Sequence, residues 1–154
     1  MHTEIKPARV SDEIVIGGEL HVFIMGPCVI ESEEHLLKMA ERLKAIKDKF
    51  QLPIIFKASF DKANRTSIQS YRGLGLDEGL RILQRVKDDY GFSVTTDIHD
   101  VSQVEPAAKV VDLLQVPALL ARQTDLVVAC AESGKACSIK KGQFMAPWDC
   151  KNLV

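Results

Sequence analysis

The sequence lacks the features that would assign it to a membrane, secreted or nucleic-acid-binding class. No apolar run approaches the roughly 20 residues that span a bilayer, and the first residues contain no hydrophobic secretory segment. Lysines and arginines nearly balance the acids, for a formal net charge of -1. No overall field therefore favours nucleic acid or an acidic membrane surface. We expect a cytoplasmic protein that binds neither.

Two common kinds of ligand motif are also missing. The four cysteines, Cys28, Cys130, Cys137 and Cys150, form no CxxC pair, which argues against a disulfide framework and a self-contained zinc site. No GxGxxG follows the first apolar strand and no P-loop is present, so neither glycine-rich nucleotide motif applies. The composition, 46% hydrophobic and 27% charged, is typical of a globular domain.

A strand followed by a helix recurs along the chain. A short hairpin is predicted over residues 14–20, with its turn at Gly17-Gly18. Apolar patterns then predict strands at 22–25, 52–59, 92–98, 111–117 and 136–141. The first of these should be buried on both faces, as parallel strands usually are.

Helices are predicted between the strands. The first is capped by Ser32 and runs to residue 50, and the second covers residues 76–90 and is ended by Gly91. The third is capped by Ser102, the fourth begins at Thr124 and is closed by Gly134, and another begins near Trp148. Five strand-helix units in succession predict an α/β fold with a parallel sheet and right-handed crossovers. An open doubly wound sheet and part of a (β/α)8 barrel both stay open, since a complete barrel typically needs about 250 residues.

The segment from Phe56 to Gly75 concentrates cations among amide and hydroxyl side chains. Its cations are Lys57, Lys62, Arg65 and Arg72, and they follow the apolar run LPIIF. Fixed lysine and arginine donors match phosphate and carboxylate oxygens. Loops at the carboxyl ends of parallel strands are where α/β proteins bind ligands. We predict a site for small anionic ligands here, and a solvated charged loop is the alternative.

Each predicted strand ends in polar residues, which in a barrel converge on one face. In chain order they are Cys28; Lys57 and Ser59; Asp97 and His99; Gln115; and Lys140, Lys141 and Gln143. Two residues have open local interpretations. Cys28 is either a small buried residue or a thiolate ligand of a metal. Arg122 is either a surface residue or a phosphate contact.

Several longer motifs carry a family resemblance. FKASFDKANRTS, SYRGLGLDEG, TTDIH, LLQVPALLARQTDL and IKKGQFMAPWD resemble successive motifs of the 3-deoxy-D-manno-octulosonate 8-phosphate synthases, over residues 22–154. The resemblance implies a homotetrameric (β/α)8 TIM barrel of lipopolysaccharide biosynthesis. Such enzymes condense phosphoenolpyruvate with D-arabinose 5-phosphate and release phosphate. Residues 1–154 would form a single, incomplete barrel domain.

Two alternatives accompany this resemblance. The related 3-deoxy-D-arabino-heptulosonate 7-phosphate synthases share the GPC turn but typically read KPRTS where this chain reads KANRTS. A non-catalytic half-barrel is the other alternative, because the last three β/α units are not in this chain.

The resemblance also implies roles for individual residues. Lys57, Lys62, Asn64, Asp97 and Lys140 are the expected catalytic residues. The expected phosphoenolpyruvate contacts are Lys57, Ser59, Lys62, Lys140 and the backbone N–H of Ala118. The expected arabinose 5-phosphate contacts are Asn64, Arg65 and Thr66, with Arg122 reaching the phosphate from a neighbouring subunit. Gln115 would line the same cavity as Asp97.

The resemblance makes Cys28 the expected ligand of a divalent metal ion such as Zn, Fe or Mn. The family's remaining ligands, a His, a Glu and an Asp, lie on strands six to eight, outside this chain. Neither Asp97 nor His99 is one of them. A catalytic metal ordinarily needs about three protein ligands, so Cys28 alone makes no site. A half-barrel would also expose strand edges and apolar surface, so we expect it to associate.

Overall fold

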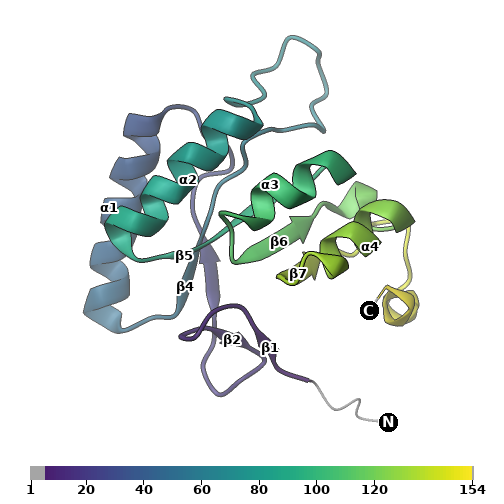
Figure 1. The fold of residues 1–154 in the computed structure, drawn as a ribbon, viewed down its shortest axis with the longest axis horizontal. Helices are drawn as coiled ribbons and strands as arrows, with labels where there is room; N and C mark the ends of the chain where they lie inside the picture. The colour runs from purple at the N-terminus through teal and green to yellow at the C-terminus, as the bar shows by residue number, and fades with distance from the viewer. Residues whose placement is uncertain (1–5, 154) are drawn as a thin grey trace.

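The main sheet has five parallel strands in sequential order. The computed structural model describes residues 6–153. The strands are β3 (Phe23–Met25), β4 (Ile54–Lys57), β5 (Ser93–Asp97), β6 (Leu113–Val116) and β7 (Ala136–Ile139), and each pairs with the next. A doubly wound sheet reverses its strand order, and this sheet does not. The sheet and its helices are therefore half of a (β/α) barrel (Figure 1).

Four α-helices connect the strands and cover one face of the sheet (Figure 1). They are α1 (Glu33–Phe50), α2 (Leu76–Tyr90), α3 (Val104–Ala108) and α4 (Thr124–Glu132). Three short 3-10 helices are η1 (Val101–Gln103), η2 (Ala118–Leu120) and η3 (Pro147–Asn152). No helix in the described part of the chain is both long enough and apolar enough to cross a membrane.

The strongest helix signals of the sequence are confirmed. The Ser32 hydroxyl accepts a 3.1 Å hydrogen bond from the His35 N–H, which caps α1. Leu36 and Ala40 of α1 are buried, as their helical spacing predicts. Gly91 ends α2 with φ 65, a left-handed conformation that glycine adopts without steric penalty.

Two local predictions are wrong. The hairpin pairs β1 (Ala8–Arg9) with β2 (Val15–Ile16), and its turn lies at residues 10–14 instead of at Gly17-Gly18. The N–H groups of Val10 and Ser11 close this turn by donating to the Ile14 carbonyl. In the third helical segment, Ser102 lies within η1 and is not the cap. The carboxylate of Asp100 caps η1 instead, accepting from the Ser102 N–H at 2.9 Å.

The prediction that the first parallel strand is buried on both faces is also wrong. The side chains of β3 keep exposed fractions of 41%, 41% and 36% at Phe23, Ile24 and Met25. Within residues 6–153, β3 pairs with β4 along one edge and with nothing along the other. An unpaired edge leaves both its hydrogen-bonding groups and its side chains open to solvent.

Alternation along the strands separates an outer apolar layer from an inner face. Ile54 and Phe56 pack toward the helices, whereas Ile55 faces inward and contacts Ile14 of the hairpin. Toward the carboxyl ends the inner face becomes polar. The strand register pairs Asp97 with Gln115. Lys57 lies two residues after Ile55 on β4, so its side chain faces the same inner side of the sheet. The hairpin thus closes the apolar end of the inner face and leaves the polar end open.

Candidate functional site

A polar cluster centred on Asp97 occupies the inner face where the strands end. The Asp97 carboxylate accepts hydrogen bonds from Ser59 Oγ at 2.5 Å, Lys57 Nζ at 2.9 Å and Gln115 Nε2 at 2.5 Å. Lys62 Nζ lies 3.8 Å from the same carboxylate. Residues from β4, β5, β6 and the loop after β4 therefore meet at one acid.

Ser59 joins the two lysines to this acid. Its hydroxyl donates to Asp97 and accepts from Lys57 Nζ at 3.1 Å and from Lys62 Nζ at 3.2 Å. These three bonds use the single proton and both lone pairs of a hydroxyl. Because Ser59 is fully buried, a side chain with no such capacity would leave the ammonium groups with fewer partners.

The charges of the cluster perturb one another. Burial alone would raise the pKa of Asp97, but the Lys57 ammonium and the bonds from Ser59, Lys57 and Gln115 outweigh it. The pKa of Asp97 therefore lies well below its usual range, and the group stays ionised. Burial lowers the pKa of Lys57 despite the attraction of Asp97, and the nearby Lys62 and Lys140 ammonium groups lower it further. Cations outnumber the one acid here.

A cavity of about 350 Å³ opens beside the cluster. Five residues that the resemblance assigned to the site line it: Lys62, Asn64, Asp97, Ala118 and Lys140. The remaining lining residues are Ala63, His99, Pro117, Leu119, Leu120 and Gln143. A cavity of this size with excess positive charge suits a small anion, because lysine donors can replace the water that a phosphate or carboxylate loses.

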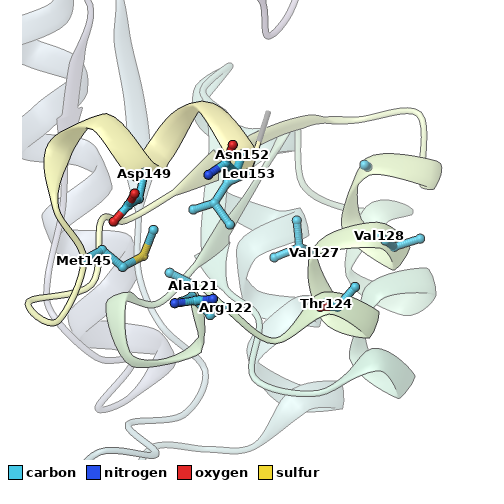
Figure 2. Close-up of a pocket in the computed structure, with 10 residues that line it drawn as sticks. Ala121, Arg122, Thr124, Val127, Val128, Met145, Asp149, Asn152 and Leu153 are labelled. Atoms are coloured by element: carbon cyan, nitrogen blue, oxygen red, sulfur yellow. The ribbon is translucent and has the colours of Figure 1, made fainter.

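Other predicted site residues lie outside this cavity. Arg65 and Thr66 are exposed on the loop between β4 and α2, which projects beyond the end of the sheet (Figure 1). Arg122 lines a separate cavity of about 540 Å³ between α4 and η3, where Asp149 and Leu153 lie across from it (Figure 2). Within this chain the structure does not bring these three residues to the lysine cluster.

One cation of the loop is already neutralised. The Arg72 guanidinium forms two hydrogen bonds with the Asp61 carboxylate, the Nε bond measuring 2.8 Å. Arg72, one of the four cations that the sequence places in this segment, is therefore paired with an acid in the structure. The partner is 11 residues away, and no helical or strand spacing connects the two positions.

Cys28 lies in the connection between β3 and α1 and is exposed. The turn before it packs closely on β4, because a Cβ atom at Gly26 would lie 2.0 Å from the Lys57 carbonyl oxygen. Gly26 also has φ 150, where other residues are strained. Among residues 6–153 no three His, Cys, Asp or Glu side chains gather as a metal site. The residues present do not by themselves fit a metal ion.

His99 is the residue that sequence reasoning weighed but did not assign to the site. Its ring packs edge-on against Phe60, with centroids 5.8 Å apart, and lines the cavity. Burial lowers the pKa of His99, and Lys62 and Arg72 act in the same direction, whereas Asp61 and Asp97 oppose the shift. The imidazole is therefore neutral at neutral pH. Its strand-end position in TTDIH was the available signal.

A β/α half-barrel with a cationic cavity at the carboxyl ends of its strands has the architecture of barrel enzymes that act on anionic substrates. The profile of the DAHP synthetase I family matches residues 3–154, and the chain belongs to this family. The resemblance found in the sequence motifs is confirmed by individual relatives as well.

Those relatives include proteins named 2-dehydro-3-deoxyphosphooctonate aldolase from three bacteria. The protein of Trichlorobacter lovleyi is 61% identical over 138 residues, which are 90% of this chain and 51% of that protein. The protein of Geotalea daltonii is 58% identical over 142 residues, 92% of this chain and 52% of the relative. For Pelobacter propionicus the identity is 55% over 148 residues, with coverages of 92% and 54%. The chain spans about half the length of these relatives.

Proposed function

We propose that the protein containing this half-barrel condenses phosphoenolpyruvate with D-arabinose 5-phosphate, giving 3-deoxy-D-manno-octulosonate 8-phosphate and phosphate. The observation that carries the proposal is the pairing of Lys57 and Lys62 with a single carboxylate, with the Lys140 ammonium close to Lys57 and lining the same cavity as Asp97. Two anionic substrates repel each other, and fixed ammonium groups are the means of holding both in one cavity. The names of the relatives favour this reaction over the heptulosonate alternative.

In this proposal the cavity divides between the two substrates. Lys57, Ser59, Lys62, Lys140 and the N–H of Ala118 bind phosphoenolpyruvate, with Asp97 and Gln115 fixing the lysines. Asn64, Arg65 and Thr66 bind the sugar phosphate from the loop after β4. Because Arg122 faces a separate cavity, it would act on the sugar phosphate of a neighbouring subunit, as a homotetramer allows.

The chemistry balances without any further reactant but water. C3 of phosphoenolpyruvate attacks the aldehyde carbon of arabinose 5-phosphate, whose oxygen becomes a hydroxyl. Water adds at C2, and the resulting hemiketal phosphate breaks its C–O bond to release phosphate. The lysine cluster stabilises the negative charge on both substrates before and during these steps.

The role of Cys28 stays part of the proposal. In the whole protein it would supply one thiolate to a divalent metal ion such as Zn, Fe or Mn. No step is assigned to a metal in this chain, because Cys28 has no companion ligands within the described residues. A cytoplasmic location in lipopolysaccharide biosynthesis belongs to the same proposal.

Calorimetric titration of the chain with phosphoenolpyruvate tests the cavity. We expect binding by the wild-type chain and a loss of at least tenfold in affinity for Lys140→Met, since one charge-assisted contact is worth about 1.5–3 kcal/mol. Lys109→Met is the matched control, because Lys109 is an exposed lysine directly after α3 that is paired with Glu105. Equal affinities in all three proteins would contradict the assignment.

Phosphate release from phosphoenolpyruvate tests the reaction. The assay compares D-arabinose 5-phosphate with D-erythrose 4-phosphate as the second substrate, with a divalent metal ion in excess. Release with the five-carbon sugar supports the octulosonate reaction, and release only with the four-carbon sugar supports the heptulosonate reaction. Binding without release would favour the non-catalytic half-barrel. The observation behind this second candidate is the unpaired edge of β3, which shows that the barrel is not closed within the described residues.

A further inference from the structure

The loop between β4 and α2 is closed at its base by two interactions. The N–H of Lys62 donates to the Arg72 carbonyl at 2.7 Å, and the Asp61 carboxylate pairs with the Arg72 guanidinium. These contacts hold Lys62 in the cavity. They do not by themselves hold the outer part of the loop, where Asn64 and Arg65 lie.

Tyr71 links this outer part to a different segment of the chain. Its hydroxyl lies 3.1 Å from the carbonyl oxygens of both Ile30 and Glu31, which precede α1. Its own carbonyl oxygen accepts a hydrogen bond from Arg65 Nε at 3.1 Å. One residue therefore links the Arg65 guanidinium, across the loop, to the connection between β3 and α1, which contains Cys28.

Packing alone does not account for Tyr71 at this position. The residue is 48% exposed, so its ring buries only part of its apolar surface. The loop also packs closely two residues further on. At the nearby Gly73, with φ 126, a Cβ atom would lie 2.2 Å from the Phe60 carbonyl oxygen and 3.2 Å from Val29 Cγ2.

Arg65 is left with capacity to bind an anion. Among the described residues it forms no ion pair with an acid, unlike Arg72, and its one hydrogen bond uses Nε. The two terminal nitrogens of a guanidinium make the bidentate contacts typical of phosphate binding. A bond that fixes Nε orients these nitrogens.

We propose that Tyr71 is a positioning residue that sets the affinity for the sugar phosphate. Its hydroxyl anchors the loop to the Cys28–Glu31 segment, and its carbonyl orients Arg65 toward the phosphate group. The inference rests on the proposed function, because it takes Arg65 as a contact of arabinose 5-phosphate. It predicts that loss of one hydroxyl weakens the binding of one substrate and not of the other.

The test compares Tyr71→Phe with Tyr90→Phe in the full chain. Both changes remove one hydroxyl and keep the ring. Tyr90 is a matched control because it packs beside the core at the end of α2 and its hydroxyl has no hydrogen bond among residues 6–153. The first measurement, made without ligand, is hydrogen exchange at the Lys62 and Ser70 amides, which are hydrogen bonded within the loop.

Binding of each substrate by calorimetry is the second measurement. In Tyr71→Phe we expect faster exchange at the Ser70 amide in the outer loop and unchanged exchange at the Lys62 amide, which the Arg72 carbonyl holds at the base. We also expect about three- to tenfold weaker binding of arabinose 5-phosphate, the range for one hydrogen bond. Binding of phosphoenolpyruvate and the behaviour of Tyr90→Phe should match the wild type. Unchanged exchange at the Ser70 amide, or equal weakening for both substrates, would overturn the proposal.

The two measurements also separate this inference from the proposed function. If the wild-type chain binds neither substrate, the function assigned to the cavity fails for this chain. The anchoring by Tyr71 is then decided by exchange alone: acceleration confined to the loop supports it, and identical exchange in both variants refutes it.

Discussion

Replacing Asp97 by asparagine removes the acid that neutralises the lysine cluster while keeping the shape of the side chain. Asp97 is 6% exposed and accepts bonds from Lys57, Ser59 and Gln115. The amide oxygen of the new side chain would still accept from the Ser59 hydroxyl. Its NH₂ group would then face the Gln115 NH₂ group, which is also a donor. Lys57 and Lys62 would then lose their shared counter-charge, with the Lys140 ammonium nearby.

The expected loss of stability follows from the burial of these groups. Removing one partner of a buried ion pair destabilises a protein by about 3–5 kcal/mol, because the other charge is left unpaired. Lys57 and Lys62 keep 17% and 15% of their side-chain area exposed, so water partly replaces the acid. We therefore expect about 3 kcal/mol for Asp97→Asn, at the low end of that range. Adding Lys57→Met should restore part of the loss, since it removes the unpaired charge.

Urea unfolding followed by far-UV circular dichroism measures this loss. Protein concentration must be equal in all samples, because association makes apparent stability depend on concentration. Asp48→Asn is the matched control: Asp48 forms an exposed pair with Lys44 on α1, so its loss should be within about 1 kcal/mol. A loss below about 1 kcal/mol for Asp97→Asn, or no recovery in the double variant, would refute the argument that Asp97 neutralises buried charge.

Two further predictions concern association and pH. The open edge of β3 should make the chain elute as an oligomer in size-exclusion chromatography, and Ile24→Lys on that edge should shift it toward monomer; a wild-type monomer would contradict this. Burial lowers the pKa of His99, so the unfolded chain binds a proton more readily than the folded chain below the ordinary pKa of 6.5. The stability that the neutral His99 imidazole contributes is therefore fully present above pH 6.5 and is lost progressively below it. The urea midpoint of His99→Gln should fall less than that of the wild type as the pH is lowered; parallel plots of midpoint against pH for the two proteins would rule out this contribution.

Much of the chain could be predicted from local patterns. The helices α1 and α2 follow from apolar spacing, from the Ser32 hydroxyl and from the left-handed Gly91, all of which act within a few residues. The site residues at the strand ends could be selected for the same reason, since polar residues interrupt apolar runs where parallel strands end. At the third helical segment the sequence pattern selected Ser102 as the cap, whereas the carboxylate of Asp100, two residues earlier, caps η1.

The sequence by itself determined the β/α units, the polar strand ends and the family resemblance. The β/α pattern left a doubly wound sheet and a barrel open, and the resemblance implied the barrel. The tertiary structure confirmed the barrel, because strand order depends on which strands pair. It also decided how the cations are paired: Arg72 pairs with Asp61 across the loop, and Lys57 meets an acid 40 residues away in the chain. Such contacts depend on strand register and loop closure across the fold, and local spacing of residues carries no record of either.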